Sequence, residues 1–269
     1  MSAPPPIVLS VVVPSYDDAV LLRGCLQALA VQTRMPDEVI VVDNGSHDDT
    51  AAVAREFGAT VVTEPQRGVL HATAAGFDAA SGTVLGRLDA DSRPGSDWAA
   101  RVVARFEADP TLGGLTGTGE FYGRGPVWRF IGRYVYLGGY FLTMRLVLGR
   151  LPLFGSSFAL RREVWHELRP RLHLNDPRVH DDLDITAVLS PATGVDFDRA
   201  LRVQVSARPF DDFAGFRRRA SWAFHILAVN LREVSWGRRI VACSRGRRMR
   251  RRALGSRARS EATRRRTPR

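Results

Sequence analysis

Strand-like and helix-like patterns of apolar residues alternate at short intervals through the first ninety positions of the chain. Residues 7–13 form a run rich in β-branched residues and leucine, which is typical of a strand buried on both faces. Similar strand patterns occupy residues 38–42, 60–63 and 84–88. Helical patterns fill the intervals, beginning with residues 22–29, where apolar side chains recur at the spacing of one helical face. Four strands with intervening helices predict a parallel, doubly wound α/β sheet.

The pattern becomes less regular in the second half of the chain. An amphipathic helix is expected over residues 96–108, an exposed strand over residues 195–205, and a long helix rich in arginine and aromatic residues over residues 213–236. Residues 134–148 are mostly apolar, but this stretch is shorter than the ~20 residues that a spanning helix needs. It is therefore either a core helix or a segment that lies on a membrane surface.

Acidic residues stand where three of the predicted strands end. Asp17 follows the first strand, Asp43 follows the second, and Asp89 and Asp91 follow the fourth. Each cluster alone is also explained by the preference of Asp for turns. In parallel sheets, however, ligands bind outside the carboxyl ends of the strands, so three acidic clusters on this rim indicate a ligand site.

The spacing of Asp89 and Asp91 suggests a particular ligand. Mg²⁺ and Mn²⁺ prefer oxygen ligands and commonly take one or two protein carboxylates together with substrate phosphates. A site for a diphosphate and a divalent cation is the natural hypothesis, since the cation would neutralise charge as a diphosphate departs. The motif is short and occurs often by chance, so it needs support from the rest of the chain.

That support comes from a series of motifs between residues 9 and 189. The motifs are Val12-Val13-Pro14-Ser15-Tyr16-Asp17, Leu26-x-x-Leu29-x-x-Gln32-Thr33, Glu38-Val39-Ile40-Val41-Val42-Asp43-Asn44-Gly45-Ser46-x-Asp48-x-Thr50, Leu88-Asp89-Ala90-Asp91 and Asp181-Asp182-x-Asp184. Their order and spacing resemble those of the family 2 glycosyltransferases, enzymes with an inverting mechanism and a nucleotide-binding GT-A fold.

The resemblance implies a donor site for a nucleoside-diphosphate sugar linked to UDP or GDP. Pro14, Tyr16 and Asp17 would lie against the base and ribose, and Asp43 would accept a hydrogen bond from the base. Asp89 would face the ribose and the metal shell. Asp91 would ligate Mg²⁺ or Mn²⁺.

The resemblance also implies the catalytic group and the acceptor side. Asp182 would be the general base that takes the proton of an acceptor hydroxyl while the oxygen attacks the anomeric carbon, with inversion. Gly155 and Ser156 resemble an acceptor-side loop, for which an ordinary turn is nearly as good an explanation. Asp181 is a weaker acceptor-side candidate, because acidic residues are favoured in the first turn of any helix.

Two family features are missing. Many relatives carry an Arg-Asn pair where this chain has Thr73 and Ala74. Three explanations stay open: Arg67 substitutes for the arginine, His71 does so, or the donor differs. The Gln-x-x-Arg-Trp signature of the processive polymerases keeps only Trp222 here. The second departure, in a chain whose sequence shows no flanking transmembrane helices, favours transfer of a single sugar over polysaccharide synthesis.

On the basis of this resemblance, we expect the chain to divide into three parts. Residues 1–210 would form the GT-A catalytic domain, with a nucleotide-binding half over residues 1–95 and an acceptor-side half over residues 96–210. Residues 211–236 would form a C-terminal helix. Residues 237–269 form an arginine-rich tail.

Charge is concentrated in the arginine-rich tail. The chain carries a net charge of +11, all 39 basic residues are arginine, and the tail holds 14 arginines against Glu261 alone. The tail therefore carries +13 and the remainder −2. With few apolar anchors it is expected to be disordered or only conditionally helical.

The tail also motivates the rival functions. The alternative to an enzyme is a protein that binds sugars, nucleic acid or a membrane through the tail and has no transferase activity. For the enzyme we expect no specific nucleic acid but contact of residues 237–269 with an anionic membrane surface. The N-terminus does not read as a signal peptide and the two cysteines suggest a reducing compartment, so we expect a cytoplasmic protein at the inner face of the plasma membrane, acting on a lipid-linked or cell-envelope acceptor.

Overall fold

The computed structural model describes residues 6–123, 125, 130, 132, 137–208 and 213–266. The expected domain boundary at residues 210–211 and residues 134–136 of the apolar stretch lie outside the described residues. Within the described ranges, no helix combines the length and the apolar character needed to cross a membrane.

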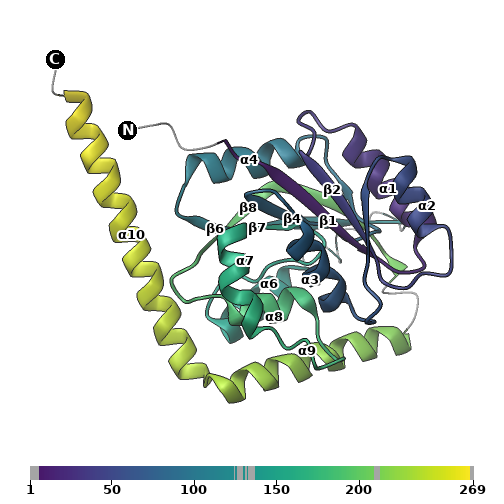
Figure 1. Ribbon diagram of the computed structural model, residues 1–269. Helices are drawn as coiled ribbons and strands as arrows, with labels where there is room; N and C mark the ends of the chain where they lie inside the picture. The colour runs from purple at the N-terminus through teal and green to yellow at the C-terminus, as the bar shows by residue number, and fades with distance from the viewer. Residues whose placement is uncertain are drawn as a thin grey trace.

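A mixed sheet of eight strands organises the fold, in the order β3-β2-β1-β4-β7-β6-β8-β5 (Figure 1). The strands are β1 Leu9–Ser15, β2 Glu38–Asp43, β3 Thr60–Thr63, β4 Val84–Arg87, β5 Arg93–Pro94, β6 Leu112–Tyr122, β7 Phe158–Arg161 and β8 Gly194–Ser206. Strands β1 to β4 are parallel, as the apolar pattern predicts. Strand β7 runs antiparallel to both β4 and β6, while β6 and β8 are parallel. The predicted α/β class and mostly parallel sheet are thus confirmed.

Helices cover both faces of this sheet. They are α1 Ala19–Ala30, α2 Thr50–Glu56, α3 Val69–Ala79, α4 Trp98–Ala108, α6 Gly138–Leu148, α7 Arg162–Leu168, α8 Asp181–Val188, α9 Phe213–Glu233 and α10 Trp236–Arg266, with a short 3₁₀ turn at Arg169–Arg171. Because successive side chains of a strand point to opposite faces, Val11 and Val13 of β1 pack into one core with Trp98, while Val12 packs into the other with Trp165. The sheet therefore buries apolar side chains on both of its faces.

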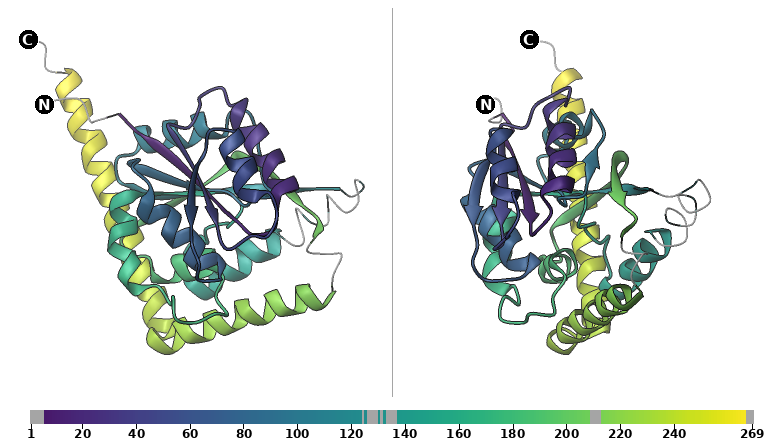
Figure 2. Two further views of the ribbon diagram at one scale, coloured as in Figure 1. Left: turned by 45° about the vertical axis from the view of Figure 1, so that its right-hand side comes forward. Right: turned by 90° about the vertical axis from the view of Figure 1, so that its right-hand side faces the viewer.

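The arginine-rich tail differs from the expectation. Residues of the tail continue helix α10, which meets α9 at a sharp bend and runs along the side of the domain (Figures 1 and 2). Arg239 is buried and donates to the carbonyl oxygens of Ala187, at 2.6 Å, and Asn230, at 3.1 Å. Cys243 is buried against α6. The start of the tail is thus helical and held to the domain, because buried arginines here serve as anchors that their charge alone does not reveal.

A buried ionic cluster attaches α8 to α9. Asp184 is fully buried and accepts hydrogen bonds from the ring Nδ1 of His173 at 2.6 Å and from Asn230 at 3.1 Å. The Nε2 atom of His173 lies 3.0 Å from Glu233. Burial disfavours the imidazolium, but the hydrogen bonds with Glu233 and Asp184 outweigh it and raise the pKa of His173 above its usual value.

This cluster predicts a pH-dependent stability. A raised histidine pKa stabilises the fold fully below the unfolded value of about 6.5, and the stabilisation is lost as the pH rises through the folded pKa. We expect the difference in melting temperature between the wild type and His173→Gln to shrink between pH 6 and pH 8, measured by circular dichroism. A difference that is the same at every pH contradicts the assignment.

Candidate active site

A cavity of about 360 Å³ opens at the carboxyl ends of β1 and β4. Its walls include four of the residues that the sequence places in a donor site, Pro14, Tyr16, Asp89 and Asp91. The end of each strand dictates this arrangement, because Pro14 is still paired with β2 and Asp89 is the second residue after β4. The cavity thus lies at the edge of the sheet where parallel α/β folds bind ligands.

Two other predicted residues shape the wall instead of lining the cavity. Asp17 adopts a left-handed conformation with φ of 47°, and its carboxylate accepts the backbone N–H of His47 at 2.6 Å. That hydrogen bond holds the pKa of Asp17 below its usual value. Asp43 accepts the backbone N–H of Ser46 at 2.9 Å. The Asp17 carboxylate therefore fastens the loop after β2 to the loop after β1, whereas the Asp43 carboxylate fixes the start of the loop after β2.

Two arginines bring positive charge to the cavity. The guanidinium carbon of Arg67 lies 3.0 Å from the centre of the Tyr16 ring, and Arg67 also lines the cavity. Arg208 follows β8 and reaches Asp18 at 3.0 Å and Asp91 at 3.8 Å. Of the two substitutes considered for the missing arginine, Arg67 is in the lining and His71 is not. Sequence reasoning missed Arg208, since no motif marks it and the fold alone carries it to the rim.

Within the cavity, the surroundings of Asp91 disfavour the ionised form of its carboxylate. Its side chain is only 18% exposed, and burial together with the negative charge of Asp89 raises its pKa to about 7. A divalent cation would relieve this repulsion, so the pair suits a cation whose other ligands come from phosphates and water. In the described part of the chain no group of three or more His, Cys, Asp or Glu side chains could hold a metal ion by itself.

Arg87 links the donor rim to α8. It is 2% exposed, and its guanidinium pairs with Asp89 at 2.5 Å and with Asp181 at 3.0 Å. Burial alone would lower its pKa, but Asp181 and Asp89 raise it above the ordinary arginine value. Thr73 also donates to Asp181, at 2.7 Å. Asp181 is thereby occupied in holding Arg87 and Thr73, which is a structural role.

The loop of Gly155 and Ser156 joins the two acidic centres. Ser156 donates its hydroxyl to Asp89 at 2.6 Å, and the backbone N–H of Gly155 donates to Asp182 at 3.0 Å. The carbonyl oxygen of Gly155 accepts from Arg87. A Cβ atom at position 155 would lie 3.2 Å from the Asp182 carboxylate, which explains the glycine. The loop that the sequence assigns to the acceptor side thus contacts both Asp89 and Asp182.

Asp182 keeps one carboxylate oxygen close to this loop and to α6. The Oδ2 atom accepts from Gly155 and from the Tyr140 hydroxyl at 3.3 Å, while Oδ1 accepts the N–H of Leu183 at 2.7 Å. Burial and the neighbouring Asp181 raise its pKa. Asp182 does not line the donor cavity, but an aspartate with a raised pKa that shares a loop with Asp89 is suited to general base chemistry.

Removing the buried cation at position 87 tests this network. Arg87→Met leaves two carboxylates, Asp89 and Asp181, without their partner, so we expect a loss of about 3–5 kcal/mol in the free energy of unfolding, measured with urea. The exposed pair of Arg101 and Asp97 is the control, and Arg101→Met should cost no more than about 1 kcal/mol. Equal, small losses for both variants are incompatible with a buried network around Arg87.

Comparison with known proteins adds a family match. The family model described as Glycosyl transferase family 2 matches residues 10–169. The chain is similar to Glycosyltransferase AglE of Haloferax volcanii, with 36% identity over 104 residues that cover 36% of this chain and 34% of that protein. It is also similar to a PGL/p-HBAD biosynthesis glycosyltransferase of Mycobacterium tuberculosis, with 35% identity over 111 residues that cover 39% and 42%. The chain thus spans between a third and a half of the length of these curated relatives.

Solved structures share the fold. One is a mannosyltransferase, PcManGT, from Pyrobaculum calidifontis in complex with GDP-Man and Mn²⁺, with a TM-score of 0.62 and 22% identity, covering 90% of this chain and 74% of that one. Another is glucosyl-3-phosphoglycerate synthase from Mycobacterium tuberculosis in complex with Mn²⁺, UDP and glucosyl-3-phosphoglycerate, with a TM-score of 0.60 and 20% identity, covering 82% and 80%. At these identities the likeness establishes the fold.

Proposed function

The chain belongs to glycosyl transferase family 2, and from this premise we propose that it moves one sugar from a nucleoside-diphosphate donor to a hydroxyl acceptor with inversion at the anomeric carbon. The observation that carries the proposal is the junction at Gly155 and Ser156, where the donor carboxylate Asp89 and the candidate base Asp182 are tied to one loop. A donor sugar bound beside Asp89 would therefore lie next to a general base.

The donor half of the proposal rests on the cavity of Tyr16, Arg67 and Arg208. An aromatic ring stacked by a guanidinium offers a flat surface for a nucleotide base, and Arg208 offers charge for phosphates. Asp91, with Asp89 beside it, would hold Mg²⁺ or Mn²⁺, which supplies charge neutralisation for the departing diphosphate. The solved relatives' complexes with GDP-Man or UDP and Mn²⁺ support the same ligand class.

In the transfer step, Asp182 accepts a proton. The acceptor hydroxyl oxygen forms a bond to the anomeric carbon, the bond from that carbon to the diphosphate oxygen breaks, and the leaving diphosphate keeps the electron pair. The proton of the acceptor hydroxyl passes to Asp182. The raised pKa of Asp182 suits this step, because a base that holds a proton more firmly near neutral pH drives the transfer better.

An acceptor at a membrane is the second part of the proposal. Only Leu148 is buried in helix α6, whereas Leu142 and Leu146 are 62% and 61% exposed. This exposure favours a surface role for the apolar stretch over a core helix. Together with the arginines of α10 it supports a lipid-linked or cell-envelope acceptor and attachment to the inner face of the plasma membrane.

A panel of UDP-linked and GDP-linked sugars tests the donor site. We expect the melting temperature to rise with one nucleotide class when Mn²⁺ or Mg²⁺ is present, since a ligand at about 100 times its Kd adds about 2.7 kcal/mol to stability. The rise should disappear when EDTA is added. A flat response to every donor, with and without metal, overturns the proposal.

A further inference from the structure

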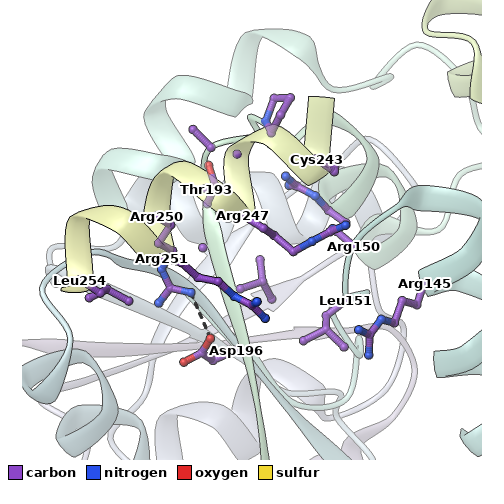
Figure 3. A pocket seen from close by; sticks show the side chains of 15 residues that line it. Arg145, Arg150, Leu151, Thr193, Asp196, Cys243, Arg247, Arg250, Arg251 and Leu254 are labelled. Carbon is purple, nitrogen blue, oxygen red and sulfur yellow. Dashed lines mark hydrogen bonds and ion pairs between the residues drawn. The ribbon is translucent and has the colours of Figure 1, made fainter. Parts of the chain in front are cut away.

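A second cavity, of about 230 Å³, shares no lining residue with the donor cavity, and its lining is shown in Figure 3. Its wall contains residues 193–196, where β8 begins. Strands β4 and β6 both run antiparallel to β7, and β8 runs parallel to β6, so β8 points the same way as β4. The start of β8 and the end of β4 therefore lie at opposite edges of the sheet, and this cavity is separate from the proposed donor site.

Positive charge dominates the second cavity. Five arginines line it, and they come from α6, from the turn that follows it and from α10: Arg145, Arg150, Arg247, Arg250 and Arg251. Asp196 is the one carboxylate among the lining residues, and it is already paired with Arg250 at 3.1 Å and with Arg105 at 2.9 Å. The remaining arginines leave an uncompensated positive surface that an anion would fit.

Arg150 is the strongest single indication of a ligand. It is 8% exposed, and its Nη2 atom donates to the carbonyl oxygen of Ser190 at 2.6 Å. Its Nη1 atom is buried and has no hydrogen-bond partner among the described residues. A buried donor without an acceptor is costly, and the cost is larger for a charged group. Because Arg150 lines the cavity, a small rotation of its guanidinium would present this atom to an acceptor bound there.

Helix α10 packs closely against the domain where it forms one wall of the cavity. A Cβ atom at Gly246 would overlap the carbonyl group of Pro191, so the helix backbone approaches this turn as closely as a glycine permits. Arg247 donates to the carbonyl oxygen of Gly149, and Arg250 pairs with Asp109 as well as Asp196. Figure 3 shows Arg247, Arg250 and Arg251 projecting from one side of α10 toward the start of β8.

We propose that this arginine-lined cavity is a binding site for a phosphate-bearing anion. Guanidinium groups match phosphate oxygens with paired, charge-assisted hydrogen bonds, which makes phosphate the anion best suited to several converging arginines. The phosphate can belong to a free anion or to a phospholipid headgroup. Leu254 lines the cavity and is 37% exposed, so an acyl chain would also find an apolar contact at its rim.

Two double variants of equal charge test the site. Arg145→Gln with Arg251→Gln removes two lining arginines that make no ion pair within the described part of the chain. Arg248→Gln with Arg252→Gln removes two exposed arginines of α10 that do not line the cavity. Melting curves establish that both proteins are folded. Calorimetry with pyrophosphate in EDTA, and flotation with vesicles of phosphatidylcholine with or without phosphatidic acid, then report binding.

We expect the lining variant to lose binding by about tenfold or more, and the control variant to stay within about twofold of the wild type. Saturable binding of pyrophosphate identifies a free anion, and binding only to acidic vesicles identifies a headgroup. Failure of the wild type to bind either probe overturns the proposal, and so does an equal loss in both double variants. Because no donor sugar or metal is present, the result is independent of the transferase assignment.

Discussion

Replacing Asp182 by asparagine should reduce the rate of sugar transfer by about 10²–10⁴-fold, the range that a positioned general base contributes. Asparagine preserves the size of the side chain and one oxygen that can accept the Gly155 N–H, so the loop should keep its place. It cannot take the proton of the acceptor hydroxyl. Binding of the donor should therefore persist while turnover is lost.

The measurement pairs steady-state transfer assays with calorimetric donor affinity on the same preparation. Asp97→Asn is a matched control, because Asp97 is a half-exposed aspartate paired with Arg101 on α4. Its turnover should remain within about twofold of the wild type, as expected for a surface pair. Near-normal transfer by Asp182→Asn shows that another group accepts the proton and that the assignment of the base is wrong.

The strand ends were the part of the site that the sequence could predict. A buried strand pattern locates its own carboxyl end, and polar residues immediately after it must lie at the rim, as Pro14, Tyr16, Asp89 and Asp91 do. The sequence could not separate these residues from Asp17 and Asp43. Whether a rim carboxylate faces the cavity or fastens a loop depends on which backbone N–H groups the neighbouring loop presents, and this is decided by tertiary contacts.

Arg87 illustrates why the centre of the network escaped prediction. It lies in a strand that reads as apolar, and its partner Asp181 is more than ninety positions away. A buried arginine is tolerable only because these carboxylates converge on it, and that convergence is a property of the folded sheet. Similarly, only its contacts with other residues distinguish the loop of Gly155 and Ser156 from an ordinary turn.

In the arginine-rich tail, the composition did not reveal the contacts with the domain. Apolar and small residues do recur along its start, with Ile240, Cys243 and Gly246 facing the domain, but the surrounding arginines outweigh them in any average. Deleting residues 237–269 would remove these anchors together with Arg239. A truncation meant to remove charge without disturbing the domain should therefore begin beyond Leu254, the last lining residue of the arginine-lined cavity.

Replacing Asp91 by asparagine should have effects of opposite sign with and without metal. In the metal-free wild type, burial and Asp89 raise the pKa of Asp91 to about 7, well above the unfolded value of about 3.9. The ionised carboxylate thus destabilises the fold progressively as the pH rises between these values, and fully above pH 7. Asparagine removes that charge, so the variant should melt at the same temperature as the wild type or higher at pH 8 in EDTA.

With Mn²⁺ present the order should reverse. Mutation of a residue that merely orients a metal ligand costs about 10–100-fold in metal affinity, so loss of a direct carboxylate ligand should exceed about 100-fold. Metal-dependent turnover and the metal-dependent thermal shift should both disappear in Asp91→Asn. Ser156→Ala, which removes only a hydrogen bond to Asp89, should keep a measurable Mn²⁺ response. If Asp91→Asn binds Mn²⁺ as the wild type does, Asp91 is not a metal ligand.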